Sequence, residues 1–257
     1  LFILGADKIF VYVIKLHPNV MKTLKFYESL GKLEIEMMRH PRDLTSTNES
    51  KISQTQQNQN EMVSLNDCFY KHLFEFEFLL PIDIDELILP VRKSDKTWSD
   101  LMNREIEKRK KENLDLNSGY SVRNVFFLSD NIHEGEIQSE VPKNFKFLQT
   151  IYRAKNFSHK HTGEKSFQNT AKVLAMHNHN PLKCLHSDIC DCHHFKTKHA
   201  QINHYRRDCE NYPKHECEDF KKNTVEDKKL WRYKKEVIQN VKKALDGLTK
   251  FRICLLY

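Results

Sequence analysis

The sequence contains no run of about 18 consecutive apolar residues, the length that a transmembrane helix needs. It also lacks an N-terminal segment typical of a secretory signal peptide. These absences exclude a membrane-spanning helix from the 257 residues. The chain starts with Leu1, and residues 1–13 already resemble the inside of a domain. We therefore expect the chain to be N-terminally incomplete.

Strong basicity is absent from most of the chain. The formal net charge is +7, and residues 221–252 alone hold eleven Lys and Arg against four Asp and Glu. We therefore interpret residues 1–220 as the main domain and residues 221–257 as a basic helix that packs on it or extends it. A solvated Lys-rich helix explains this charge, so we predict no binding to nucleic acid.

The histidine-rich part of the sequence lacks the regularly spaced cysteine pairs of most structural zinc sites. No Cys-x₂-Cys pair accompanies the histidines, although tetrahedral zinc sites usually show such spacing. Residues 161–165, HTGEK, imitate the linker between zinc fingers, yet the nearest upstream cysteine is Cys68. A zinc-binding Cys/His module remains an alternative, built from Cys184, Cys190, Cys192, His193, His194, His199 and His204.

In an oxidising compartment the same cysteines would form disulfides. Cys209 and Cys217 are a reasonable pair across a short loop, and further options are offered by Cys184, Cys190 and Cys192. Seven cysteines are an odd number, so at least one stays outside these bonds, and Cys68 is our candidate. Two N-glycosylation sequons, at Asn48 and Asn156, fit such a compartment.

Hydrophobic periodicity predicts alternating strands and helices in the first third of the chain. The expected order is strand, helix, strand, polar loop, helix and strand, over residues 9–13, 18–30, 33–37, 45–60, 61–74 and 74–82. This order predicts an α/β fold with a mainly parallel central sheet flanked by helices. Later elements are expected as a helix starting at residues 97–99, strands at 122–128 and 171–176, and a helix at 225–248.

The stretch of residues 74–90, FEFEFLLPIDIDELILP, combines an alternating strand pattern with a group of carboxylates. Asp83, Asp85 and Glu86 follow the predicted strand within an apolar frame. Ligands of parallel sheets bind beyond the carboxyl ends of the strands. Because buried carboxylates must be paired or metal-bound, the pattern predicts a site for Mg²⁺ or Mn²⁺.

Five blocks, in this order, resemble glycosyltransferase family 92. They span nearly the whole chain: GADKIFVYV with LKFYESLGKLEI, SLNDCFYKH, IDIDELILP followed by TW, EKSFQNTAKVLAMH, and INHYR, at residues 5–35, 64–72, 82–98, 164–177 and 202–206. The resemblance implies a GT-A-like nucleotide-diphospho-sugar transferase fold. It also implies an inverting transferase that uses UDP-galactose and Mn²⁺ to galactosylate glycans, with fucosylated N-glycan cores as expected acceptors.

Members of the family are typically type II Golgi membrane enzymes. The resemblance therefore implies a lumenal catalytic domain, residues 1–220, anchored through a segment that this chain does not contain. An inactive glycan-binding protein that keeps the fold is a further alternative, because a fold does not determine a function. The intact carboxylate motif counts against it.

The resemblance places metal and donor contacts on particular residues. Asp85 is the expected metal ligand, and Asp83 is expected to contact the metal or the donor. A histidine would complete the metal site, with His177 as first choice and His204 as the alternative. Asp67 and Arg206 are the other expected donor contacts, since a guanidinium pairs well with diphosphate.

An inverting reaction also needs a general base within hydrogen-bond reach of the acceptor hydroxyl. Glu134, Glu136 and Glu140 lie after a predicted strand, and the sequence does not choose among them. Glu86 is expected to support the carboxylate loop or to reach the acceptor.

Overall fold

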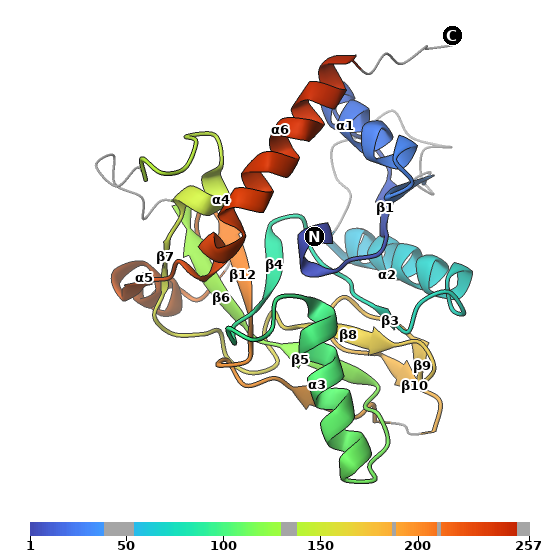
Figure 1. Cartoon of the computed structure of the whole chain (residues 1–257). Helices are drawn as coiled ribbons and strands as arrows, with labels where there is room; N and C mark the ends of the chain where they lie inside the picture. Colours follow the sequence, from blue (N-terminus) through green and yellow to red (C-terminus); the bar gives the residue numbers. More distant parts are fainter. Residues whose placement is uncertain (39–53, 130–137, 187–188, 210–211, 251–257) are drawn as a thin grey trace. The chain divides into compact units, whose positions relative to one another are not determined.

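The computed structural model describes residues 1–38, 54–129, 138–186, 189–209 and 212–250 (Figure 1). The chain forms two compact units, one of residues 1–64 and 235–257 and one of residues 65–234. These units do not follow the division at residue 220 that we expect from the sequence, and a catalytic domain of residues 1–220 stays a prediction. None of the helices in the described ranges has the length and apolarity needed to cross a bilayer.

The first unit contains a strand–helix–strand segment that matches the prediction. Strands β1 (Ile9–Val13) and β2 (Leu33–Met37) pair in parallel, with Ile9 opposite Leu33, and helix α1 (Pro18–Ser29) connects them. The proline at the first helical position needs no amide hydrogen there. Gly31, with φ of 69°, makes the turn from α1 into β2 that other residues rarely adopt.

Two further helices of the chain contribute to this unit. Helix α2 (Gln54–Lys71) starts inside the predicted polar loop, whose first part lies outside the described residues. Helix α6 (Lys234–Lys250) packs on α1, since a Cβ added at Gly247 would lie 2.5 Å from the ring of Phe26. The helix predicted for residues 225–248 is therefore wrong at its start. Strand β13 (Thr224–Glu226) and a 3₁₀ helix (Lys229–Tyr233) precede α6.

The described residues of the second unit form two mixed sheets and two strand pairs. The strand orders are β11–β5–β8–β3, β4–β12–β6, β13–β7 and β10–β9. Besides β13, the strands of this unit are β3 (Phe78–Leu79), β4 (Glu86–Pro90), β5 (Gly119–Val122), β6 (Asn124–Leu128), β7 (Tyr152–Ala154), β8 (Lys165–Asn169), β9 (Val173–Ala175), β10 (Lys183–Cys184), β11 (Cys192–His194) and β12 (Ala200–Arg206).

The expectation of a mainly parallel sheet is wrong. In the second unit β12 pairs in parallel with β6 and β11 with β5, whereas the pairs β12–β4, β5–β8, β3–β8, β13–β7 and β10–β9 are antiparallel. Two parallel strands that follow each other in sequence need a long crossover connection, usually a helix. Of the predicted strand–helix–strand units, the one formed by β1, α1 and β2 has such a connection between paired parallel strands. Most later strands follow one another without a helix, so antiparallel pairing is available to them.

The described part of the second unit also contains the α-helices α3 (Trp98–Lys111), α4 (Lys146–Gln149) and α5 (Lys214–Lys222). The predicted start of α3 is confirmed, because Thr97 and Asp100 form a reciprocal capping box. The indole of Trp98 donates to the carbonyl of Ile88 and packs edge-on against Phe167. These contacts attach α3 to β4 and β8.

The strand predicted for residues 74–82 is largely wrong. Helix α2 ends at Lys71, the amide of Glu75 then donates to the carbonyl of His72, and only Phe78–Leu79 form a strand. The side chain of Phe74 is 97% exposed. The carboxylates therefore lie just before and at the start of β4, instead of at the carboxyl end of a buried strand.

A disulfide closes the apolar cluster around β6. Cys209 and Cys217 are joined, as the sequence predicts, and both are buried against residues of β6, β7 and α5. A second disulfide links Cys184 and Cys190, while Cys68 and Cys192 take part in neither bond. Four described cysteines are thus committed to disulfides.

Replacing Cys209 and Cys217 together by serine should lower the free energy of unfolding by at least about 2.5 kcal/mol. The crosslink closes a short loop, and the chain-entropy relation gives roughly this value before any loss of packing. Urea unfolding without reductant measures the difference from the wild type. Equal urea midpoints for the two proteins would contradict the prediction.

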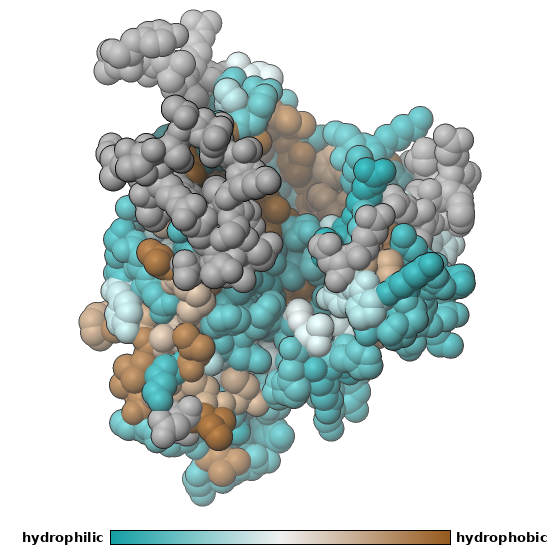
Figure 2. Space-filling view, turned by 180° about the vertical axis from the view of Figure 1, so that it is seen from behind, coloured by the Kyte–Doolittle hydropathy of each residue, from teal (hydrophilic) through white to brown (hydrophobic). Residues whose placement is uncertain are grey.

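Apolar side chains are exposed around the β9–β10 hairpin and the loop that its disulfide closes. Leu174, Leu182, Leu185 and Ile189 are all exposed there. Figure 2 shows brown side chains gathered at the lower left of an otherwise largely hydrophilic face. The charged site described next lies on other strands.

Candidate active site

Two titratable side chains meet where β4 and β12 pair. Glu86, the first residue of β4, stands opposite His204 of β12, and its Oε1 lies 3.6 Å from His204 Nδ1. The Glu86 carboxylate is almost completely buried. Burial raises the pKa of Glu86 to about 7, although the neighbouring Lys165 ammonium opposes that shift.

A buried ammonium group lies beside this carboxylate. The side chain of Lys165, the first residue of β8, is 0% exposed, with Nζ 3.4 Å from Glu86 Oε2 and 3.0 Å from Asp83 Oδ2. It also donates a hydrogen bond to Asn178 Oδ1. A buried charge needs such partners, because desolvation is otherwise too costly. Lys165 was not among the predicted site residues.

Asp85 lies on the solvent side of His204. Its Oδ2 is 3.4 Å from His204 Nε2, and its side chain is 41% exposed. Burial lowers the pKa of His204, and the carboxylate of Asp85 acts in the opposite direction. The ring of His204 stacks at a tilt on Phe126 of β6, 5.2 Å between centroids. Its imidazole is therefore held between two carboxylates and an aromatic face.

The two aspartates of the predicted motif diverge in their contacts. Asp83 is half-exposed and pairs with Lys165, whereas Asp85 pairs with His204. Between them Ile84 is fully exposed, so the apolar frame that we expected is interrupted. Asp83, Asp85, Glu86, Lys165 and His204, from here on the carboxylate cluster, thus form one connected set.

The other predicted metal ligand, His177, contacts Gln168 and His179. Its carbonyl accepts from Gln168 Nε2 and its Nδ1 accepts from the amide of His179. The next residue, Asn178, is the one that contacts Lys165. The described contacts therefore bring His204 to Asp85, and a role for His177 stays a prediction.

Of the remaining predicted residues, Arg206 is near enough to the carboxylate cluster for its charge to help lower the pKa of His204, whereas the others have different partners. Asp67 forms an ion pair with Lys71 within α2, and Arg206 is the last residue of β12. Glu140 forms an ion pair with Lys234. Glu134 and Glu136 lie outside the described residues, so the identity of the base stays a prediction.

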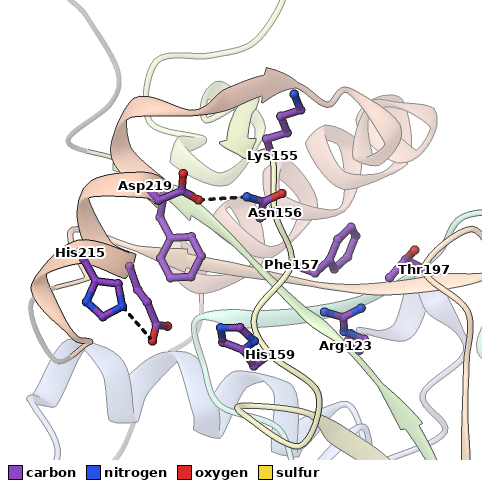
Figure 3. Close-up of a pocket in the computed structure, with 10 residues that line it drawn as sticks. Arg123, Lys155, Asn156, Phe157, His159, Thr197, His215 and Asp219 are labelled. Carbon is purple, nitrogen blue, oxygen red and sulfur yellow. Dashed lines mark hydrogen bonds and ion pairs between the residues drawn. The ribbon is translucent and has the colours of Figure 1, made fainter.

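A pocket of about 560 Å³ lies elsewhere in the second unit, and none of the carboxylate cluster lines it (Figure 3). Its lining includes Arg123, Lys155 and the sequon residue Asn156, which donates to Asp219. The guanidinium of Arg123 donates to the carbonyl of Ser158 and lies over the ring of Phe157. The pocket therefore carries two cationic and two acidic side chains, the acidic ones from Glu216 and Asp219, beside the rings of two phenylalanines.

Comparison with models of known protein families identifies the family of this chain. The family model of glycosyltransferase family 92 matches residues 2–241. The chain belongs to this family. No curated protein matches it in a separate comparison.

Membership of family 92 makes the protein a glycosyltransferase that takes a sugar donor and a glycan acceptor. The match contains every residue of the carboxylate cluster. The family 92 chain thus buries a lysine and a glutamate beneath two exposed aspartates. Unusually placed titratable groups of this kind are typical of functional sites.

Proposed function

We propose that this chain transfers galactose from UDP-galactose to a glycan, with inversion at the anomeric carbon and with Mn²⁺ or Mg²⁺ as cofactor. The observation that carries the proposal is the carboxylate cluster, in which the partly exposed Asp85 contacts the largely buried His204 beside the buried pair of Glu86 and Lys165. Fold maintenance alone does not explain such an arrangement, because apolar residues would fill the same space at lower cost.

Asp85 and His204 suit the proposed metal. A half-exposed carboxylate and an imidazole are ligands that Mn²⁺ accepts, and one or two protein ligands leave coordination positions for diphosphate oxygens. Bound there, the metal would neutralise charge that develops on the departing UDP. Asp83 is held by Lys165, so we assign it to the donor's ribose or to an outer position.

Glu86 is proposed as a positioning residue for His204. A metal-bound imidazole usually donates its other ring N–H to a carboxylate or carbonyl, and Glu86 Oε1 lies 3.6 Å from Nδ1. Asn124 Nδ2 lies 3.2 Å from the same nitrogen, while its Oδ1 has no hydrogen-bond partner among the described residues. Turning that amide by half a rotation would offer Oδ1 to Nδ1–H and leave Nε2 facing Asp85.

The proposed reaction is a single displacement. The acceptor hydroxyl oxygen forms the bond to the anomeric carbon, the bond from that carbon to the diphosphate oxygen breaks, and the hydroxyl proton passes to a base. Glu86 is too enclosed to reach an acceptor, so Glu134, Glu136 and Glu140 remain the proposed bases. The two disulfides support a Golgi lumenal location, since such bonds persist in oxidising compartments.

The first experiment measures UDP-galactose binding by calorimetry with Mn²⁺ and with EDTA, and then transfer to a fucosylated N-glycan. We expect binding that needs Mn²⁺ and prefers UDP-galactose to UDP-glucose. Since the donor is an α-galactoside, the product should be a β-galactoside, which NMR coupling constants report. Absence of binding to any UDP-sugar in the presence of Mn²⁺ would overturn the proposal.

A further inference from the structure

A second group of ligand atoms gathers around Glu164, just before the start of β8. Glu164 immediately precedes Lys165, and its residue is only 1% exposed. Neither carboxylate oxygen has a hydrogen-bond partner among the described residues. A buried carboxylate normally accepts several hydrogen bonds, because an unpaired buried charge is strongly unfavourable. Glu164 therefore requires a partner for its charge, and the described residues around it donate no hydrogen bond to it.

Two imidazoles converge on this carboxylate. Nδ1 of His194, at the end of β11, lies 3.1 Å from Glu164 Oε2. Both atoms nevertheless lack a hydrogen-bond partner within the described ranges, so this close approach does not have hydrogen-bond geometry. His161 lies on the solvent side, with its ring at 88° to that of His194 and the ring centroids 5.1 Å apart. One ligand atom from each of the three residues lies within 4.8 Å of the other two.

We propose that His161, Glu164 and His194 bind a divalent transition metal, with Zn²⁺ as the best match. Zinc bonds to nitrogen and oxygen are about 2.0–2.2 Å long, so ligand atoms on a tetrahedron lie about 3.3 Å apart. The 3.1 Å between Glu164 Oε2 and His194 Nδ1 is close to this value, and His161 would need to approach from within 4.8 Å. Two imidazoles and one carboxylate form a recognised zinc ligand set, with water in the fourth position.

The backbone before β8 brings these ligands together. His161 has φ of 67° and Gly163 has φ of 64°, so the backbone is left-handed at the first ligand and again just before the second, Glu164. Non-glycine residues rarely adopt this conformation, although histidine does so more readily than most, and such positions cluster at functional sites. The turn places His161 and Glu164, three residues apart, on one side of the loop. The HTGEK segment, which resembled a zinc-finger linker, thus supplies two of the three ligands.

A metal at this site would fasten the loop before β8 to β11. These two segments are separated by β5 in the sheet, so the metal would add a crosslink that the strand pairing does not provide. Lys165, the next residue after Glu164, points instead to Glu86 and Asp83. The proposed zinc therefore contacts none of the carboxylate cluster, and this proposal does not depend on the proposed function.

Zinc titration of the full chain, without a histidine tag and against a competing chelator, tests the proposal. We expect one tight equivalent in the wild type and in Asp85→Asn, which removes the proposed donor-site ligand. Glu164→Gln and His161→Ala should each weaken zinc binding at least about 100-fold, because loss of even an outer partner costs about 10–100-fold. With cobalt in place of zinc, the wild type should show the visible absorption of a tetrahedral site, and Glu164→Gln and His161→Ala should not.

His159→Ala is the matched control, since His159 lies in the same loop but lines the neighbouring pocket (Figure 3). It should bind zinc as the wild type does. His161 is exposed, so circular dichroism of His161→Ala should show an intact fold and keep the test valid. No tight zinc in the wild type, or unchanged affinity in both ligand variants, would overturn the proposal. Equal loss in His159→Ala would overturn the assigned ligand set.

Discussion

Asp85→Asn should lower kcat/KM for galactosyl transfer by about 10³-fold while the protein remains folded. The carboxylate is the proposed metal ligand next to His204, and a metal ion provides several kcal/mol of charge stabilisation at a departing diphosphate. A loss of about 4 kcal/mol corresponds to about 10³ in rate. Because the Asp85 side chain is 41% exposed, its replacement by the similarly sized amide leaves no buried charge unpaired.

The experiment compares steady-state kinetics of wild type and Asp85→Asn over a range of Mn²⁺ concentrations. Asp115→Asn is the matched control, since the Asp115 side chain is exposed and only loosely paired with Lys172. We expect the control to behave as the wild type and the urea midpoints of all three proteins to agree. Transfer by Asp85→Asn within tenfold of the wild type, at saturating Mn²⁺, would refute the ligand assignment.

Local sequence signals predicted the parts of the fold that local interactions determine. The segment of β1, α1 and β2 has clear periodicity and a helix of ordinary length, and its strands pair as expected. The start of α3 was also predictable, because Thr97 and Asp100 satisfy backbone groups within four residues of each other. These elements need no information from distant parts of the chain.

The alternating phenylalanines after α2 show where such reasoning fails. Five residues of period 2 cannot distinguish a strand from a turn that follows a helix, and here the chain turns at His72 and Glu75. The expectation of a parallel sheet failed for a related reason. β4 pairs with β12, more than a hundred residues later in the chain, and such pairing depends on tertiary packing rather than on propensity.

The candidate site was predictable only in part. The carboxylates of the motif are visible in the sequence, and His204 was named there as an alternative ligand. Lys165 carries no local signal, because KSFQN reads as an ordinary half-polar strand although all five residues are buried. Its importance follows from Asp83 and Glu86, which lie about 80 residues earlier and become its neighbours only in the folded chain.

Lys165→Met should therefore lower the free energy of unfolding by about 3–5 kcal/mol at pH 8.5, the usual cost of removing one partner from a buried ion pair. The variant fills a similar volume but leaves the buried carboxylate of Glu86 without its ammonium neighbour. Lys172→Met is the matched control. Its partially exposed ammonium lies 3.7 Å from the exposed carboxylate of Asp115, and surface pairs contribute about 0–1 kcal/mol.

The size of this loss should depend on pH, with a sign set by Glu86. Burial raises the pKa of this carboxyl to about 7 in the wild type, and removal of Lys165 should raise it further. A raised pKa means that the native state binds the proton more tightly than the unfolded state, so stability falls as pH rises towards the native value. About one pH unit above its native pKa the wild type loses no further stability through Glu86, whereas the variant, with its higher pKa, still does. Urea unfolding should thus show a larger difference at pH 8.5 than at pH 6, and a pH-independent difference would contradict the assignment of Glu86 as the partner of Lys165.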